Sequence, residues 1–429
     1  MTFEQTFCPS PWFHMRINNA GHYEYCRWAS KLDRASAAGI HQQSPITWFQ
    51  NDLASLRQDL LEGRPVSGCQ DCWAMEQYGK VSGRQRQLLK TGVREQQFVQ
   101  SLASSPWVRV FERTSQQQGI TDQTPQDWQI DLGNYCNSAC VFCTPFSSSR
   151  LATEFQSLGL ISRPQPRAWC DDPVLLDRFL ADLVQCPNLK YLHFIGGETL
   201  ITPGFRRILE QLVAHDLARQ ITIGFTTNLT TWSDSTVRLL DQFQNVNLGM
   251  SIECVSSLND YVRYGSEIDQ VMTTLSRWIM VARERNWLIQ LRPTPNILTI
   301  GQLRSIYELA WQQGLAVESC NFIARPEFMK PSVLPPTLRE PIIQDLEHWI
   351  EQQGTVSQTA VINTRDPNQA PQQILQDAVS YVRYLKGQPD HSHLLADLVT
   401  YLRTLERSRG NCVLDHLPQY EQIFRSAGY

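Results

Sequence analysis

The sequence lacks the features that would place the protein in a membrane or on a nucleic acid. Residues 1 to 20 contain no charged start followed by an apolar segment, and no later run approaches the ~18 apolar residues that span a bilayer. Basic residues are not in excess, because 38 lysines and arginines stand against 42 aspartates and glutamates, for a formal net charge of −4. This balance argues against a nucleic-acid-binding surface but leaves room for a local basic groove. We expect a soluble, cytoplasmic protein without a membrane partner.

Cysteine, in contrast, is plentiful, with 12 residues in a chain of 429. In a reducing compartment such residues are more often metal ligands or buried thiols than disulfides. The length exceeds that of one ordinary core and indicates two or three domains.

Three cysteines form the most informative motif of the chain. Cys136, Cys140 and Cys143 follow a short apolar run at spacings of four and three residues. A four-iron cluster normally takes four thiolates, so a loop that offers three leaves one iron open to a ligand from outside the protein. The alternative is a structural zinc site whose fourth ligand lies elsewhere in the chain.

A second motif lies about fifty residues downstream. The run 191–195 has the pattern of a buried strand and ends in Gly196, Gly197 and Glu198, where two residues without Cβ atoms allow a close approach. Together the motifs resemble the radical SAM superfamily. In that family a CxxxCxxC loop holds a four-iron, four-sulfur cluster, and S-adenosylmethionine chelates the fourth iron. Cys136, Cys140 and Cys143 match that loop, and the Gly-Gly-Glu run matches the motif that binds the methionine amino group.

Two further motifs continue the resemblance in the same order. Thr227 and Asn228 resemble the Thr-Asn pair near the cofactor ribose. Ser251 and Arg263, twelve residues apart, resemble the pair that contacts the ribose and the carboxylate. Glu253 and Cys254 depart from the family's Asp-Gly at this point, so the local loop is expected to differ.

The first part of the chain carries another set of cysteines, namely Cys8, Cys26, Cys69 and Cys72. The segments 12–17 and 22–25 predict a hairpin around a turn that contains glycine, and residues 47 to 62 have the apolar spacing of one helix. A second helix is expected over 84–99. The layout resembles a twitch domain, the shortened relative of the SPASM domain, and this likeness implies an auxiliary four-iron cluster. A zinc ribbon with four cysteine ligands is the alternative.

Strand patterns and helix patterns alternate in the part of the chain that follows the N-terminal region. Strands are expected at 128–132, 190–195, 220–226, 246–252, 288–293 and 317–323, and helices at 173–185, 204–215, 234–243, 268–285 and 301–313. The alternation predicts an α/β fold with parallel strands, which matches the partial (βα)6 TIM-like barrel of the radical SAM family. Every motif above then falls at the carboxyl end of a strand, where ligands bind in such folds.

We therefore divide the chain into three regions. Residues 1–120 form the small cysteine-rich twitch domain, 121–330 the radical SAM barrel and 331–429 a helical tail, with helices at 338–352, 370–386 and 392–405. A polar linker over 115–127 separates the first two regions.

Several other residues have alternative roles. Cys254 is a candidate donor of a hydrogen atom to a substrate radical, against a role in packing that it would share with Cys170, Cys186, Cys320 and Cys412. His193 is expected to be a core residue. Arg292, at a strand end, either binds a carboxylate or forms a structural ion pair.

Three functions fit these patterns. The first is a radical SAM enzyme that modifies a peptide by epimerisation, crosslinking or excision, as implied by the twitch resemblance. The second is a radical SAM enzyme acting on a small metabolite, and the third is a metal-stabilised binding module without turnover. The first two imply S-adenosylmethionine, two four-iron clusters and a reducing partner such as flavodoxin or ferredoxin.

Overall fold

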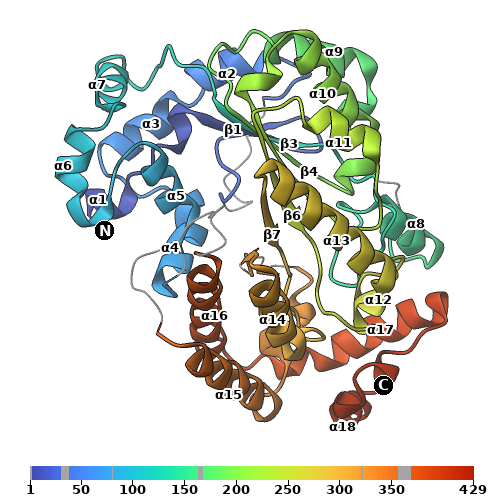
Figure 1. Ribbon diagram of the computed structural model, residues 1–429. Helices are drawn as coiled ribbons and strands as arrows, with labels where there is room; N and C mark the ends of the chain where they lie inside the picture. The colour runs from blue at the N-terminus through green and yellow to red at the C-terminus, as the bar shows by residue number, and fades with distance from the viewer. Residues whose placement is uncertain are drawn as a thin grey trace.

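The computed structural model is that of a partial, open barrel, flanked by N-terminal helices on one side and C-terminal helices below it (Figure 1). The residues that the structure describes are 2–29, 38–79, 81–162, 168–319, 322–323, 325–355 and 369–429.

Eight strands form one sheet in the order β2-β1-β3-β4-β5-β6-β7-β8. Their bounds are β1 (His14–Ile17), β2 (Tyr23–Glu24), β3 (Asp127–Asp131), β4 (Tyr191–Ile195), β5 (Thr222–Thr227), β6 (Asn245–Met250), β7 (Leu288–Leu291) and β8 (Ala316–Val317). All neighbours are parallel except β1 and β2. The predicted α/β fold with six parallel strands, β3 to β8, is confirmed. The last strand is shorter than expected, and Cys320 and residue 321 of that segment lie outside the described residues.

Helices connect the parallel strands on the outside of the barrel (Figure 1). They are α8 (Ser149–Ser157), α9 (Pro173–Leu183), α10 (Pro203–Ala214), α11 (Asp234–Leu240), α12 (Leu258–Val262), α13 (Ile268–Arg285) and α14 (Leu303–Gln313). The predicted helix 268–285 is confirmed at both ends.

The two faces of the sheet have different chemistry. On β3, Trp128 and Ile130 belong to the apolar core, whereas Asp127, Gln129 and Asp131 line cavities inside the barrel. The same alternation recurs on β4 and β5, because successive side chains of a strand point to opposite faces. The barrel therefore has an apolar outer face and a polar interior.

The sheet crosses the boundary expected near residue 120. β1 pairs in parallel with β3, with His14 opposite Asp127 and Ile17 opposite Ile130. The hairpin of the first region is thus part of the barrel sheet, and a local sequence pattern could not reveal this long-range pairing.

The rest of the N-terminal region is helical. Its helices are α1 (Phe3–Thr6), α2 (Pro45–Asn51), α3 (Ala54–Leu61), α4 (Gln70–Gln77), α5 (Gly83–Lys90), α6 (Phe98–Ala103) and α7 (Val108–Gln116). The single helices predicted over 47–62 and 84–99 are wrong, since the chain breaks at residues 52–53 and again between α5 and α6. A separate apolar core around Phe7, Trp12, Phe98 and Phe111 holds these pieces together.

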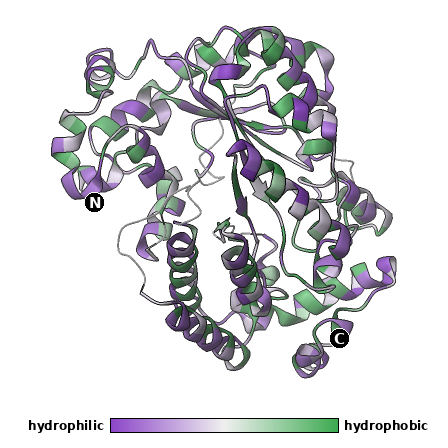
Figure 2. Cartoon of the chain, in the orientation of Figure 1, coloured by the Kyte–Doolittle hydropathy of each residue, from purple (hydrophilic) through white to green (hydrophobic). Residues whose placement is uncertain are grey.

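The C-terminal helices pack below the barrel (Figure 1). They are α15 (Pro336–Gln353), α16 (Ala370–Lys386), α17 (Leu395–Arg409) and α18 (Glu421–Ser426). Hydrophobic and hydrophilic residues alternate along α15 and α16, as expected for helices with one buried face (Figure 2). α16 also meets the N-terminal region, because the rings of Tyr78 and Tyr384 lie 5.6 Å apart. Of the helices in the described ranges, each is too short or too polar to cross a bilayer.

Candidate active site

A cavity of about 830 Å³ opens where β3 to β6 end. All ten residues predicted for the barrel cluster and the cofactor line it: Cys136, Cys140, Cys143, Gly196, Gly197, Glu198, Thr227, Asn228, Ser251 and Arg263. They come together because parallel strands bring their carboxyl ends to one edge of the sheet. We call this space the carboxyl-end cavity.

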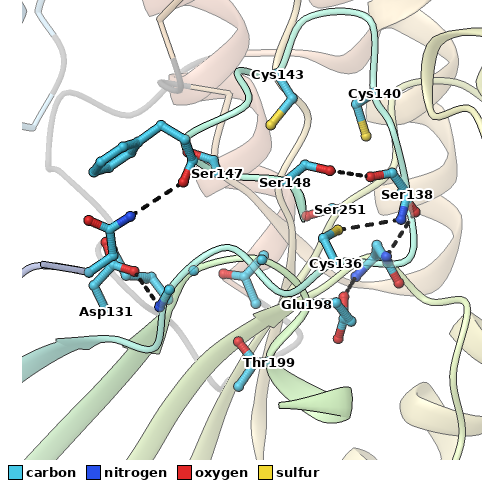
Figure 3. Close-up of a pocket in the computed structure, with 18 of the residues that line it drawn as sticks. Asp131, Cys136, Ser138, Cys140, Cys143, Ser147, Ser148, Glu198, Thr199 and Ser251 are labelled. Carbon is cyan, nitrogen blue, oxygen red and sulfur yellow. Dashed lines mark hydrogen bonds between the residues drawn. The ribbon is translucent and has the colours of Figure 1, made fainter. Parts of the chain in front are cut away.

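The cysteine loop follows β3 directly. The sulfur atoms of Cys136, Cys140 and Cys143 face a common space (Figure 3). The loop is held from two sides. Ala139 and Val141 donate backbone hydrogen bonds to the carbonyls of Tyr264 and Val262, at 2.8 and 2.9 Å. Ser148, the residue before α8, donates from its hydroxyl to the carbonyl of Ser138 at 2.6 Å. The donor set is therefore positioned by the fold.

The environment of the three thiols suits a metal cluster. Burial raises the pKa of Cys136 and of Cys143 to about 12. Burial also raises the pKa of Cys140, although the guanidinium of Arg263, with Nη1 3.9 Å from Sγ, opposes the shift. Thiolates bind metal, so these groups ionise only when a cation compensates their burial. Three soft ligands on one cavity fit a four-iron cluster with one open iron.

Steric constraints explain why two glycines follow β4. Gly196 and Gly197 have φ values of 100° and 50°, in the left-handed region. A Cβ on Gly196 would clash with the carbonyl of Gly133, and one on Gly197 with the carbonyl of Tyr135. The sequence predicted a close approach to a ligand, whereas the structure shows that the close neighbour is the backbone of the cysteine loop.

Glu198 joins two strand ends beneath the cavity. Its carboxylate accepts hydrogen bonds from the backbone N–H of Asn228 at 2.6 Å and of Leu200 at 3.2 Å. Burial raises the pKa of Glu198, and these bonds only partly offset the shift. An ammonium group entering the cavity would stabilise the ionised form, so the residue fits the amino end of an amino-acid cofactor.

Arg263 has a partner within the protein. Its Nη2 lies 2.5 Å from Oε1 of Glu253, and its guanidinium lies 5.4 Å from the ring centre of Phe142. Glu253, the residue that departs from the family motif, is thus the ion-pair partner of Arg263. The arginine is shared between an internal carboxylate and the thiol of Cys140, and no contact to a bound carboxylate is needed to explain its position.

The sequence reasoning missed one wall of the cavity. Arg16, Asn18, Asn19, His22 and Glu24, all from the β1–β2 hairpin, line it as well. Arg16 forms ion pairs with Asp131 at 3.3 Å and with Glu24 at 3.1 Å. The polar residues of the hairpin could have indicated a binding surface, but the predicted division places the hairpin in a domain separate from the barrel.

Cys254 is not among the residues that line the carboxyl-end cavity. It is fully buried, and the hydroxyl of Ser256 donates to its sulfur at 3.7 Å. Cys170 and Cys186 are buried as well, in agreement with packing roles, and Cys412 is partly buried. His193 is buried beside the Tyr191 hydroxyl, 3.2 Å away, and its expected place in the interior is confirmed.

The second cysteine set also comes together. Cys8, Cys26, Cys69 and Cys72 line one small space of about 20 Å³ between the hairpin, α3 and the start of α4. Burial raises the pKa of Cys69 and of Cys72 to about 12. Four thiols match the donor set of a four-iron cluster and that of zinc alike. Within the described ranges, no three side chains of His, Cys, Asp or Glu are grouped closely enough to hold a single metal ion.

Comparison with known proteins identifies the central part of the chain. Residues 130–282 match the family model of the Radical SAM superfamily. This range contains all ten cavity residues named above and excludes the N-terminal cysteine set. No curated protein matches the sequence.

Solved structures with a similar chain path have low sequence identity and low TM-scores. Streptococcus suis SuiB bound to precursor peptide SuiA is 13% identical over 81% of this chain and 70% of its own, with a TM-score of 0.36. Native anSMEcpe with bound AdoMet is 15% identical over 52% of this chain and 60% of its own, with a TM-score of 0.36. The match to SuiB bound to S-adenosylmethionine spans 50% of that protein.

Proposed function

The chain carries a radical SAM domain over residues 130–282, and from this premise we propose that it cleaves S-adenosylmethionine reductively and abstracts a hydrogen atom from a peptide. The observation that carries the proposal is the convergence of ten predicted residues from four strand ends on one cavity. Motifs scattered over more than a hundred positions of the sequence meet there, at the edge of the sheet where barrel enzymes bind ligands.

Cys136, Cys140 and Cys143 would hold the cluster, and Glu198 the amino group of the cofactor. When bound, the cluster and S-adenosylmethionine supply an electron and a 5′-deoxyadenosyl radical, which can take hydrogen from an unactivated carbon. The protein's own residues position and protect this chemistry. Asn228 donates from its side chain to Asn137 at 2.9 Å and to Ser138 at 3.0 Å, so it ties the end of β5 to the cysteine loop.

Arg263 has a different role in this proposal from the one implied by the family motif. Its guanidinium is buried between Glu253 and Cys140 and keeps a positive charge beside the thiol. A cation at this place favours the thiolate over the thiol. We therefore assign Arg263 to the stabilisation of the cluster ligand, with Ser251 left to contact the cofactor.

The N-terminal cysteine set is proposed to hold a second four-iron cluster. Such a cluster could accept the electron of a substrate radical and make the reaction a net oxidation, or it could only stabilise the region. The proposal of a second cluster is supported by the common space that is lined by Cys8, Cys26, Cys69 and Cys72. Zinc in the same place remains the alternative.

Peptide modification is the first candidate because the N-terminal layout resembles a twitch domain, a companion of peptide-maturing enzymes. The second candidate is a small metabolite, favoured by a further cavity of about 540 Å³ inside the barrel. A cytoplasmic location is part of the proposal, since all cysteines of the described segments are free thiols. Flavodoxin or ferredoxin would then supply the electron.

The test is anaerobic reconstitution of the full chain with iron and sulfide. Two clusters correspond to about eight irons and eight sulfides per chain. The reconstituted protein with dithionite and S-adenosylmethionine should release 5′-deoxyadenosine. Zinc uptake with little iron and no 5′-deoxyadenosine would instead indicate the third function, a metal-stabilised binding module.

A further inference from the structure

A second cavity occupies the other half of the barrel interior, and the chemistry proposed above leaves it unused. It measures about 540 Å³ and is lined by the first residues of β3, β4, β5 and β7. Arg86, Gln87 and Lys90 of α5 close it from the N-terminal region. We call it the amino-end cavity.

This cavity carries an excess of positive charge in an acidic protein. Among the described residues, five basic side chains line it: Arg27, Arg86, Lys90, Lys190 and Arg292. The acidic side chains that line it are Asp127 and Glu318. His193 adds no charge near neutral pH, because burial holds its pKa well below the usual value. The lining therefore favours an anionic ligand.

The acidic residues are already shared between cations. Asp127 pairs with Arg27 at 2.8 Å and with Lys90 at 2.6 Å. Glu318 pairs with Arg86 at 3.0 Å and with Arg292 at 2.8 Å. Each carboxylate thus pairs with two basic groups. The five basic side chains still outnumber the two carboxylates, so a further anion can be bound.

Two buried polar groups on this wall lack partners. Gln87 is 1% exposed and lines both this cavity and the small space of the N-terminal cysteines, and neither its side-chain nitrogen nor its side-chain oxygen makes a hydrogen bond within the described residues. Nε of Arg292 is likewise buried without a hydrogen-bond partner there. An unsatisfied buried amide is costly, so both groups indicate a ligand that accepts hydrogen bonds.

The amino-end cavity lies against the carboxyl-end cavity. Nη1 of Arg292 donates to the hydroxyl of Thr226 at 3.4 Å, and Thr226 lines the carboxyl-end cavity. The side chain of Arg292 reaches this place across β6 because Gly249 has no Cβ, which would otherwise overlap it. The side chains of Arg292 and Thr226 therefore stand between the two spaces, and an anion held by Arg292 lies next to the wall of the carboxyl-end cavity.

We propose that the amino-end cavity binds an oxyanion, a carboxylate or a phosphate, of the substrate. Gln87 donates a hydrogen bond to it, and Arg292 and Lys90 supply the charge. Its role as a substrate anchor rests on the proposed function, whereas anion binding by the cavity does not. The anion would hold one end of the substrate while the other end lies in the carboxyl-end cavity.

The experiment measures anion binding on the full chain after anaerobic reconstitution with iron and sulfide, in the absence of S-adenosylmethionine and reductant. Inorganic phosphate and glutarate are titrated separately in Tris chloride at fixed ionic strength, by calorimetry. We expect one saturable site. Preference for phosphate or for glutarate identifies the group that the substrate carries.

Two variants and a control locate the site. Arg292→Gln and Gln87→Leu should each weaken binding about tenfold or more, as expected for hydrogen bonds to a charged group. Gln87→Leu replaces an amide without a partner, so it should keep the thermal midpoint of the parent. Arg207→Gln removes the same charge from the outer surface, where Arg207 pairs with Asp177, and should change nothing.

Two results would overturn the proposal. One is the lack of saturable binding beyond that of chloride, and the other is equal binding in the parent and in Gln87→Leu. Neither result depends on 5′-deoxyadenosine release, so a failure of the anion site is distinguishable from a failure of the proposed function. Retained anion binding in a protein without radical chemistry would leave the site intact and remove only its role as a substrate anchor.

Discussion

The two cysteine sets have similar burial but opposite surroundings. In the barrel, Cys136 and its partners border a cavity of about 830 Å³ with Arg263 and Glu198 in its walls. In the N-terminal region, Cys8 and its partners border about 20 Å³ lined by apolar residues such as Leu56 and Leu60 and also by Arg84. One set leaves room for a second ligand and the other does not. The two cysteine sets are therefore suited to different roles. The barrel set could hold a reactive cluster, and the N-terminal set could hold a structural or electron-accepting cluster.

The strongest test of this contrast removes the barrel set. The triple variant Cys136→Ala, Cys140→Ala, Cys143→Ala should lose about half the iron and all 5′-deoxyadenosine production, because only this cluster would face the cofactor. Iron analysis and chromatography of the reaction products check the result. A triple variant that still produces 5′-deoxyadenosine would contradict the assignment of the barrel set.

Removing the other set should affect a later step. In Cys69→Ala, Cys72→Ala, cleavage of S-adenosylmethionine should persist while product formation is blocked, if the N-terminal cluster accepts an electron. Circular dichroism and solubility come first, because a metal site often supplies the folding free energy of a small region. A folded double variant that makes product at the parent rate would exclude the electron-accepting role.

A smaller effect is expected within the carboxyl-end cavity. Glu198→Gln keeps the shape of the side chain but removes the charge that an ammonium group would meet. Loss of one charge-assisted hydrogen bond corresponds to about 10- to 100-fold weaker S-adenosylmethionine binding. Equilibrium dialysis measures the change, and the visible spectrum should show an intact cluster.

Glu210→Gln serves as the matched control for this variant. Glu210 pairs with Arg206 on the exposed side of α10 and lies outside the cavity. Equal affinities for the Glu198 and Glu210 variants would mean that the carboxylate does not contact the cofactor.

An effect on stability alone, without loss of activity at neutral pH, is expected at the junction between the two regions, where His14 of β1 lies 3.1 Å from Asp127 of β3. Burial lowers the pKa of His14 to about 4, despite the opposing charge of Asp127. The unfolded chain then binds a proton that the folded protein does not, so stability is full above about pH 6.5 and falls as pH approaches 4. The loss amounts to roughly 3 kcal/mol.

His14→Gln should remove this part of the acid sensitivity. Urea unfolding at pH 7 and at pH 4.5 measures it, with the exposed His215→Gln as the control. An unchanged slope of stability against pH in the His14 variant would show that other groups cause the acid loss.

Local patterns predicted the elements of the barrel and of the C-terminal helical region well. The helices 268–285 and 370–386 have the predicted bounds, because apolar spacing and terminal residues act within a few turns. Short motifs also predicted the ten residues of the barrel cluster and the cofactor that line the carboxyl-end cavity. Each motif follows a parallel strand, and parallel strands bring their carboxyl ends to the same edge of the sheet.

The failures have a common physical origin. The place of β1 beside β3 and the hairpin wall of the cavity depend on long-range contacts, and the pairing of Arg263 with Glu253 depends on the fold of the loop after β6. The amino-end cavity could not be foreseen either, because its lining depends on the register of several strands. The domain division at residues 120 and 330 stays a prediction, with a sheet that continues across the first boundary.

The pairing of β1 with β3 also constrains the order in which the protein can be assembled. His14 and Asp127 are in contact across 113 positions of the chain. Closing so long a loop is slow and entropically costly, and the residues of β1 leave the ribosome before those of β3, so they must wait for β3 before they can pair. A nascent chain shorter than this therefore lacks the strand that fixes its hairpin. The wall that the hairpin gives to the carboxyl-end cavity can therefore form only after β3 has been made, although its residues precede β3 in the chain.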